Sequence, residues 1–251
     1  MTAFRFYLGT HQTDWLEKSE VPLFVSAIRL RLRKGELKPS CDWALDSGGF
    51  TELSTHGRWT VTPEQYVNEV HRWRQWGNLR WAAIQDWMCE DVIIHGNGKI
   101  PGTKLSIPEH QRRTVENYDT LLQLDPSIPW CPVLQGFTLD DYLRCLDLYQ
   151  KKHDLFKLPV VGIGTLCRRQ GTKEAEKIVK HFSFLGLKIH AFGFKLKGLQ
   201  NVWSDCVSSD SLAWSFAARK RPAMAGHTHK NCANCQEYAV RWRVKLLDSL
   251  Q

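Results

Sequence analysis

Residues 44–50 read Ala44-Leu45-Asp46-Ser47-Gly48-Gly49-Phe50, and this stretch decides the predicted fold class. An apolar run ends in a carboxylate and then breaks into a Ser-Gly-Gly turn, where glycine permits a tight backbone and the close approach of a ligand. A strand followed by an acid and a glycine turn is typical of α/β enzymes, which present reactive groups at the carboxyl ends of parallel strands. An Asp that only caps the next helix is the alternative for a single motif. The choice depends on whether the pattern recurs.

The same alternation of apolar strand and amphipathic helix recurs along the chain. Strands are predicted at residues 4–8, 22–28, 42–46, 80–86, 130–134, 158–162, 187–192 and 205–209. Helices are predicted at residues 62–76, 109–124, 139–151, 172–182, 212–219 and 236–247, with a long Gly- and Pro-rich loop at residues 95–108. About eight strands, most of them followed by a helix, predict an α/β fold of the (β/α)8 TIM-barrel type, with one domain over residues 1–251. A doubly wound open sheet is the alternative, but it would not explain the polar residues at the ends of so many strands.

In a barrel, the carboxyl ends of all strands face one mouth, so polar residues from distant parts of the chain should meet there. The residues placed in this way are Asp46, Asp86, Gln135, Gly162, Gly164 and Asp210. Repulsion and desolvation among three acids should separate their pKa values and divide the roles of nucleophile, proton shuttle and hydrogen-bond acceptor. Asp86 and Gln135 offer the donors and acceptors needed to read the edge of a purine. In the alternative interpretation, these residues are unrelated helix caps and turn residues.

A second feature is the segment of residues 226–235, which reads Gly-His-Thr-His-Lys-Asn-Cys-Ala-Asn-Cys. It supplies four ligands of the kind that tetrahedral Zn²⁺ prefers, namely His227, His229, Cys232 and Cys235. We therefore expect a structural zinc knuckle at about residues 226–240 that fixes the closing helix to the barrel. A redox-active cysteine pair is the alternative, although such pairs usually open a helix after a strand. The spacing does not decide which histidine binds, and Cys206 or another outside residue could complete the site.

Charge and composition indicate a polyanionic partner. The 251-residue chain has a formal net charge of +8, 11 Trp and recurrent basic clusters such as those at residues 29–34 and 219–221. Because neutralised phosphates supply most of the non-specific affinity for nucleic acids, a nucleic acid is the expected partner. Eight cysteines without framework spacing indicate reduced thiols in a cytosol-like compartment. The sequence contains neither an apolar run long enough for a membrane span nor a secretory leader, so no membrane partner is expected.

Seven short motifs carry a resemblance to a known family. In chain order they are Asp-Ser-Gly-Gly-Phe (46–50), Gln-Asp (85–86), Leu-Gln-Gly (134–136), Val-Gly-Ile-Gly (161–164), His-Ala-Phe-Gly (190–193), Ser-Asp-Ser (209–211) and the zinc knuckle followed by Tyr238. Together they resemble the tRNA-guanine transglycosylase superfamily. The chain looks closest to its 7-deazaguanine DNA transglycosylase branch, which is found in phages and in bacterial DNA-modification clusters. The likeness runs from about residue 45 to the C-terminus, and Asp-Ser-Gly-Gly is the most specific motif of the set.

The resemblance implies a zinc-bearing barrel that exchanges guanine in DNA for a 7-deazaguanine base of the preQ0 type. By position, Asp210 is implied to be the nucleophile that attacks the sugar C1′ and holds a covalent glycosyl intermediate. Asp46 is implied to be the general acid/base that handles the proton of the base. The residues implied to bind the substrate are Ser47, Gly48, Phe50, Asp86, Gln135, Gly136, Gly162 and Gly164. Such an enzyme must flip or unpair its target nucleotide, which suits a basic, Trp-rich surface.

The chain departs from the superfamily pattern in two ways. A histidine, at position 227 or 229, replaces the first Cys of the usual Cys-x-Cys-x-x-Cys zinc motif. The chain is also shorter than typical tRNA-acting members, which favours DNA as the substrate. A tRNA transglycosylase with the same chemistry and a non-catalytic, zinc-containing barrel that binds nucleic acid stay as alternatives. A metal-dependent hydrolase would need histidines at strand ends, where only His190 comes near. The expected location is a bacterial or phage-infected cytoplasm, and the sequence leaves open a homodimer or accessory proteins.

Overall fold

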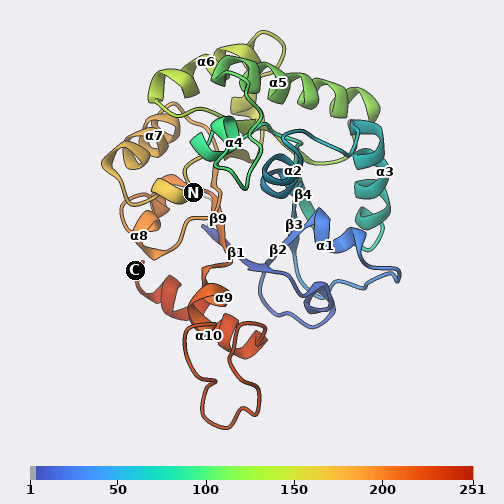
Figure 1. Cartoon of the computed structure of the whole chain (residues 1–251), viewed down its shortest axis with the longest axis vertical. Coiled ribbons are helices and arrows are strands. Elements are labelled where there is room, and N and C mark those ends of the chain that lie inside the picture. Colours follow the sequence, from blue (N-terminus) through green and yellow to red (C-terminus); the bar gives the residue numbers. More distant parts are fainter. Residues whose placement is uncertain (1–3, 251) are drawn as a thin grey trace.

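The computed structural model describes residues 4–250, and their nine strands form one parallel sheet that curls into a barrel (Figure 1). The strands are β1 (Arg5–Thr10), β2 (Leu23–Ser26), β3 (Trp43–Asp46), β4 (Leu79–Ala83), β5 (Trp130–Cys131), β6 (Val133–Leu134), β7 (Val161–Ile163), β8 (Ile189–Ala191) and β9 (Ser208–Ser211). The α-helices are α1 (Ala27–Arg31), α2 (Gly49–His56), α3 (Pro63–Arg74), α4 (Asp91–His95), α5 (Ile107–Leu124), α6 (Leu139–Gln150), α7 (Lys173–Phe184), α8 (Leu196–Leu199), α9 (Ala213–Ala218) and α10 (Gln236–Asp248). The 3-10 helices are η1 (Thr13–Glu17), η2 (Leu155–Lys157), η3 (Cys167–Arg169) and η4 (Trp203–Asp205).

The sheet closes through a strand that Pro132 divides into two short pieces. β5 pairs with β4, β6 pairs with β7, and Pro132 alone separates β5 from β6 along the chain. Proline has no N–H to donate to a ladder, so the regular pairing is interrupted at this residue. Its carbonyl still accepts a hydrogen bond of 2.8 Å from the N–H of Gly162 in β7. The predicted barrel is therefore confirmed, and the strand predicted at residues 130–134 is present as two pieces.

The longer helices surround the barrel, whereas α2 and α4 lie inside this ring (Figure 1). Several helices begin at the caps that the sequence predicts. At the start of α3, the N–H of Gln65 donates to Thr62 Oγ1 at 3.3 Å, and the N–H of Thr62 donates to Gln65 Oε1 at 2.9 Å. Thr138 and Asp141 form the same capping box at the start of α6. These reciprocal bonds satisfy backbone donors that the first helical turn leaves free.

Side chains alternate along the strands between two apolar clusters. In β1, Phe6 and Leu8 belong to the large core between sheet and helices, whereas Tyr7 belongs to a second cluster inside the barrel. This inner cluster contains Tyr7, Phe24, Ala44, Trp81, Ala83, Cys131 and Val160. The ring of His190 lies against it, with its centroid 4.6 Å from that of Trp81. The barrel interior is therefore filled with side chains below the mouth.

Several predicted element boundaries are wrong. The strand predicted at residues 22–28 ends at Ser26, because α1 begins at the next residue. The strand predicted at residues 205–209 begins only at Ser208, because η4 occupies the preceding turn, so Asp210 lies within β9 rather than after it. The short helices α2, α4 and α8 were not predicted from the sequence, because one or two turns carry too little hydrophobic periodicity to be recognised.

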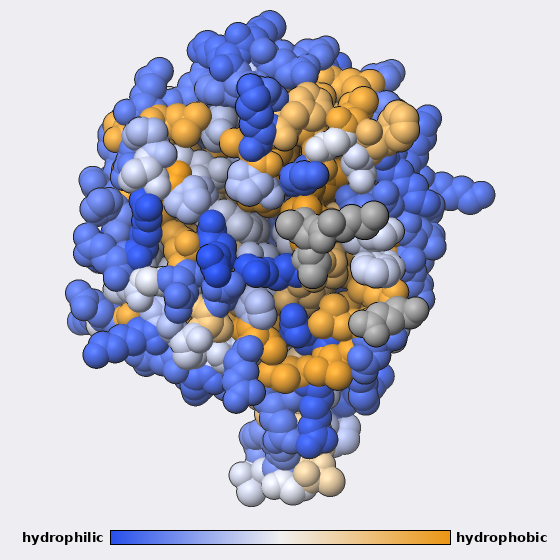
Figure 2. Space-filling model, turned by 180° about the vertical axis from the view of Figure 1, so that it is seen from behind, coloured by the Kyte–Doolittle hydropathy of each residue, from blue (hydrophilic) through white to orange (hydrophobic). Residues whose placement is uncertain are grey.

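The C-terminal helices are fixed to the barrel by a few specific contacts. In α9, Trp214 stacks on Trp15 with ring centroids 5.4 Å apart, and its indole N–H donates to the carbonyl of Gly9 at 2.8 Å. In α10, Arg243 Nε donates to the carbonyl of Phe6 at 3.1 Å. The loop between α9 and α10 projects from the body in both whole-molecule views (Figure 1, Figure 2).

The back of the molecule, shown in Figure 2, is covered mainly by hydrophilic residues, with apolar residues gathered in smaller areas between them. Within residues 4–250, no helix combines the length and the hydropathy required to cross a bilayer.

We expect Trp214→Ala to lower the free energy of unfolding by about 3–5 kcal/mol, because it leaves a large cavity and an unpaired Gly9 carbonyl. Urea denaturation followed by far-UV circular dichroism measures this change. Phe216→Ala is the matched control on the same helix, since this ring is 62% exposed. It should change stability by no more than about 0.5 kcal/mol. Equal losses in the two variants would contradict the role given to Trp214.

Candidate active site and metal cluster

A cavity of about 880 Å³ opens at the barrel mouth, over the carboxyl ends of the strands. Six of the residues predicted from the sequence line it, namely Asp46, Phe50, Asp86, Gln135, Gly164 and Asp210. They belong to β3, β9 or the connections that follow β3, β4, β6 and β7. The barrel thus brings side chains from nearly the whole chain into one cavity, as the strand-end pattern predicts.

Four residues predicted to bind substrate do not line this cavity, namely Ser47, Gly48, Gly136 and Gly162. Ser47 is buried, and Gly48 has a φ of +85°, which favours glycine. The N–H of Gly48 donates to Asp46 Oδ1 at 3.1 Å. The Ser-Gly turn therefore holds the Asp46 carboxylate in place rather than facing the cavity itself.

The other two glycines allow close packing around the cavity. A Cβ at Gly162 would lie 2.3 Å from Cε2 of the Phe192 ring, and a Cβ at Gly136 would lie 2.7 Å from Cβ of Asp141. Both distances are too short for any larger residue without movement of the neighbour. Gly162 therefore seats the Phe192 ring, and Gly136 lets α6 approach the end of β6.

Gln135 and Asp86 form the polar centre of the cavity. Gln135 Nε2 donates to Asp86 Oδ2, and Gln135 Oε1 accepts a hydrogen bond of 2.6 Å from the Thr165 hydroxyl. The N–H of Cys89 donates to Thr165 Oγ1 at 2.9 Å, so the hydroxyl hydrogen is directed at Gln135. This chain assigns the orientation of the Gln135 amide. A Cβ at Gly164 would lie 2.1 Å from Gln135 Nε2, so this glycine makes room for the amide.

The surroundings of the carboxylates perturb their ionisation. Burial raises the pKa of Asp86 to about 7; the hydrogen bond from Gln135 opposes this rise, and the charge of Asp46 adds to it. Burial also raises the pKa of Asp46, against the N–H of Gly48 and the hydroxyl of Ser26, which favour its ionised form. Such perturbed acids in a cavity are typical of functional sites.

Asp210 is held by His190, and this contact was not predicted from the sequence. Asp210 Oδ1 accepts a hydrogen bond of 2.8 Å from the N–H of Gly193 and lies 3.3 Å from His190 Nε2. On its other side, His190 Nδ1 lies 2.8 Å from Ser208 Oγ. The tautomer with its hydrogen on Nε2 fits both contacts, because it donates to Asp210 and accepts from Ser208. His190 is fully buried in the middle of β8, and a polar residue in an otherwise apolar strand was the available signal.

Three exposed cations also line the cavity, namely Arg168, Lys195 and Lys197. Arg168 belongs to one of the basic clusters of the sequence, whereas no sequence motif marked the two lysines. Arg168 lies with its guanidinium carbon 5.0 Å from the centroid of the Phe50 ring and its Nε 3.0 Å from Glu90 Oε2. The rim of the cavity is thus basic and partly aromatic, whereas its interior is acidic.

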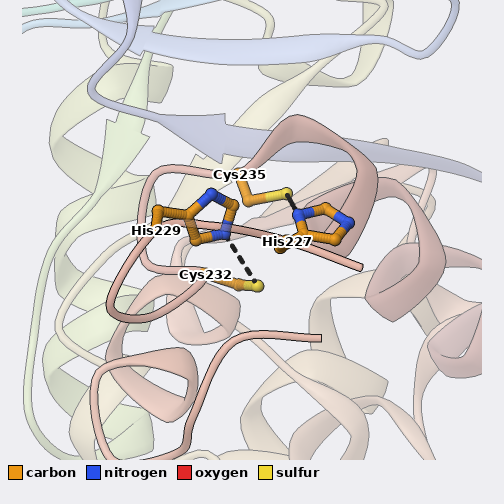
Figure 3. A group of neighbouring side chains, drawn as sticks. All are labelled: His227, His229, Cys232 and Cys235. Atoms are coloured by element: carbon orange, nitrogen blue, oxygen red, sulfur yellow. Dashed lines mark hydrogen bonds between the residues drawn. The ribbon is translucent and has the colours of Figure 1, made fainter. Parts of the chain in front are cut away.

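The four predicted metal ligands converge in the segment between α9 and α10 (Figure 3). Their ligand atoms all lie within 4.8 Å of one another. His229 Nε2 is 3.2 Å from Cys232 Sγ, and His227 Nδ1 is 3.7 Å from Cys235 Sγ. Zinc bonds of about 2.0–2.3 Å arranged as a tetrahedron place N and S ligands about 3.5 Å apart, so the donor set fits this ion. Cys206 is not part of the cluster.

One contact outside the cluster supports this fit. The second ring nitrogen of His227, Nε2, lies 3.2 Å from Glu237 Oε2. A carboxylate that accepts from the far side of a histidine fixes its orientation and is the usual outer partner of a metal-bound imidazole. The cluster can therefore hold a metal ion through both histidines and both cysteines.

We expect Asp86→Asn to stabilise the protein at neutral and alkaline pH. The folded state keeps a proton on Asp86 up to about pH 7, whereas the unfolded chain releases it near 3.8, so this group lowers stability as the pH rises through that window. At about pH 8 the variant should gain on the order of 2–4 kcal/mol, because one pKa unit corresponds to about 1.4 kcal/mol. Urea denaturation from about pH 4 to pH 8 measures the difference. Asp147→Asn, on the exposed face of α6, is the control, and parallel curves for Asp86→Asn and wild type would contradict the burial argument.

Of three comparisons with known proteins, one shows the family of this chain. A solved crystal structure, described as that of an isomerase from Sinorhizobium meliloti, shares 10% sequence identity with this chain. The matched region covers 82% of this chain and 50% of the other chain. The TM-score of 0.44 is too low to carry an argument. No curated protein sequence matches the chain. A family model described as "DeoxyPurine in DNA protein A" matches residues 2–251. The chain therefore belongs to the DeoxyPurine in DNA protein A family, a family similar to the tRNA-guanine transglycosylases.

Proposed function

We propose that this protein exchanges guanine in DNA for a 7-deazaguanine base of the preQ0 type through a covalent aspartyl-glycosyl intermediate. Family membership supports a glycosyltransferase-type enzyme that acts on DNA. The observation that carries the finer proposal is the meeting of Asp46, Asp86 and Asp210 in one cavity with the oriented amide of Gln135. One buried and two half-buried acids are costly in a binding module, so chemistry at this site explains their presence better than binding alone.

Base recognition is assigned to Asp86, Gln135 and the backbone at Gly164. The Watson–Crick edge of guanine presents N1–H and an amino group, which suit an acceptor carboxylate such as Asp86. No cation pairs with Asp86 among the described residues, so donors of the bound base would favour its ionised form. Guanine and 7-deazaguanines share this edge and differ at position 7. One recognition site therefore serves both the leaving and the entering base.

Asp210 is assigned as the nucleophile. Its Oδ1 is occupied by Gly193 and His190, which leaves Oδ2 to attack the sugar C1′. A bond forms from Oδ2 to C1′ as the C1′–N9 bond breaks, and guanine leaves with a proton from Asp46. The incoming base then gives its N9 proton to Asp46 and attacks C1′, which frees the Asp210 carboxylate. The exchange is balanced and requires no oxidant or reductant.

His190 is assigned as a positioning residue for Asp210. It is fixed between Ser208 and Asp210 and is enclosed by the aromatic rings of the inner cluster. Because an ionised carboxylate can only accept, His190 offers Asp210 the hydrogen on Nε2, and Nδ1 accepts from the Ser208 hydroxyl. This contact and the Gly193 N–H keep one carboxylate oxygen engaged and the other directed toward the substrate.

The Cys/His cluster is assigned a structural Zn²⁺. Bound zinc would cross-link the loop to the start of α10, which contacts β1 through Arg243. The whole chain, residues 1–251, then acts as one domain in which the metal fixes the C-terminal segment.

Cys232→Ser should abolish zinc binding and lower the thermal midpoint, because metal binding to a site formed only in the folded state contributes folding free energy. Zinc content of the purified proteins by atomic absorption measures the loss. Cys206→Ser is the control, since this buried thiol lies outside the cluster, and it should keep its zinc. Full zinc content in Cys232→Ser would remove this residue from the ligand set.

Asp210→Asn should reduce guanine exchange by about 10⁴-fold or more and abolish any covalent protein–DNA adduct, because an amide cannot act as the nucleophile. Asp46→Asn should reduce exchange by about 10²–10⁴-fold, the usual contribution of a general acid/base. Label exchange and denaturing gels of trapped adducts measure the two effects. Asp205→Asn, outside the cavity, is the matched control. Wild-type exchange in either active-site variant would remove that residue from its assigned role.

The proposed function is tested by adding preQ0 to the protein with duplex DNA or tRNA that carries radiolabelled guanine. Release of label from DNA alone is the expected result. Release from tRNA alone would replace DNA by tRNA as the substrate. Absence of release from both, with DNA still bound, would favour a non-catalytic nucleic-acid-binding barrel.

A further inference from the structure

A second, smaller cleft lies beside the barrel mouth and carries no part of the proposed chemistry. Its volume is about 460 Å³, and its lining residues are His11, Thr13, Arg29, Leu32, Arg33, Lys34 and Gly35. His11 and Thr13 follow the carboxyl end of β1, and the others belong to α1 or the turn after it, at the carboxyl end of β2. We call it the α1 cleft.

The α1 cleft holds buried polar atoms without a partner. His11 Nε2 and Arg33 Nε are both buried and form no hydrogen bond within the described part of the chain. Such groups cost free energy unless a ligand, ion or water satisfies them. They belong to different segments that line the same cleft, so a ligand in the cleft would lie beside both residues.

The charge of the cleft is positive and uncompensated. The ion pairs that residues 4–250 form in this region use Lys18, with Asp14, and Arg31, with Glu52 and Glu69, and none involves Arg29 or Arg33. Burial lowers the pKa of His11, and the charges of Arg29 and Arg219 lower it further. Like charges on neighbouring helical turns destabilise a helix. An anion is therefore the ligand that this cleft fits.

The contrast with Arg31 strengthens this argument. Arg31 lies on the same short helix, yet its Nε donates to both carboxylate oxygens of Glu69, at 2.8 and 2.9 Å. Arg31 is thus paired with carboxylates, whereas Arg29 and Arg33 line the cleft and form no ion pair within the described residues.

The α1 cleft adjoins the proposed catalytic residues. A Cβ at Gly48, two residues after Asp46, would lie 2.6 Å from Cγ1 of Ile28 in α1. A Cβ at Gly9, two residues before His11, would lie 2.9 Å from the carbonyl oxygen of Ser211, which follows Asp210. The cleft therefore lies on the β1–β2 side of the mouth, while Arg168, Lys195 and Lys197 follow β7 and β8.

We propose that the α1 cleft binds a backbone phosphate of the DNA strand whose target nucleotide enters the mouth. The inference rests on the proposed function for the identity of the polyanion. A phosphodiester has two free oxygens that can accept from a guanidinium and from the His11 ring, as charge-assisted hydrogen bonds require. With cations on both sides of the mouth, a strand that crosses it has a phosphate contact on each side of the flipped nucleotide.

The test measures DNA binding by the full chain with Asp210→Asn as the background, so that it does not depend on exchange. Adding Arg29→Gln and Arg33→Gln should weaken affinity for duplex DNA at least about tenfold at low salt and make the slope of log affinity against log salt shallower by about one, because one phosphate contact is lost. Lys151→Gln with Lys188→Gln is the charge-matched control. Both residues are exposed and lie at the opposite end of the barrel, just after α6 and just before β8. The control should change affinity by less than about twofold.

Two results would overturn the proposal. Equal losses in the cleft variant and the control would mean that net charge alone matters. Unchanged DNA affinity in the cleft variant would also overturn it. If the NMR signals of the His11 ring in the protein with both arginines then move on adding inorganic phosphate, the cleft binds free phosphate instead. Guanine exchange is measured separately, with Asp210 intact. Normal exchange by the wild-type protein together with unchanged DNA affinity in the cleft variant would reject the cleft and leave the proposed function intact. Lost DNA affinity in the cleft variant together with no exchange by the wild-type protein would keep the cleft and reject the proposed function.

Discussion

Closure of the sheet is the constraint on which the rest of the structure depends. The strand around Pro132 pairs with β4 through one half and with β7 through the other, so no edge is left between them. In a closed parallel sheet, the carboxyl ends of all strands lie at the same mouth of the barrel. Asp46 and Asp210 then share a cavity although they lie far apart in sequence. An open sheet with the same strands would spread these side chains along an edge.

Burial at this mouth gives chemically identical side chains different properties. Asp86 is buried beside an amide donor and no cation, whereas Asp46 receives a backbone N–H and a hydroxyl. Asp210 is held by a buried imidazole and a backbone N–H. Desolvation of these acids lowers the stability of the folded state. Functional sites often lower the stability of the fold in this way. These differences in hydrogen-bond partners are the basis on which we propose separate roles in base recognition, proton transfer and nucleophilic attack.

The sequence predicted the barrel and most of the cavity because both depend on local signals. Apolar runs that end in acids mark strands and their carboxyl ends, and Thr62 and Thr138 mark helix starts. The functions of glycines could not be predicted in this way. Gly162 faces the Phe192 ring and Gly164 faces the Gln135 amide, and this difference depends on side chains from other strands. The role of His190 was missed for the same reason, because its partner Asp210 comes from the neighbouring strand β9.

The distribution of charge reconciles an acidic cavity with a basic protein. A polyanion approaching the mouth meets Arg168, Lys195, Lys197 and the α1 cleft first, all at the rim or beside it. The carboxylates lie deeper, and the pKa of about 7 reduces the negative charge of Asp86 near neutral pH. Phosphates can therefore stay at the rim, where the attraction is strongest, while an uncharged base passes inward to hydrogen-bonding acids. Flipping a nucleotide separates these two parts of DNA in space, and the layered charge of the mouth matches that separation.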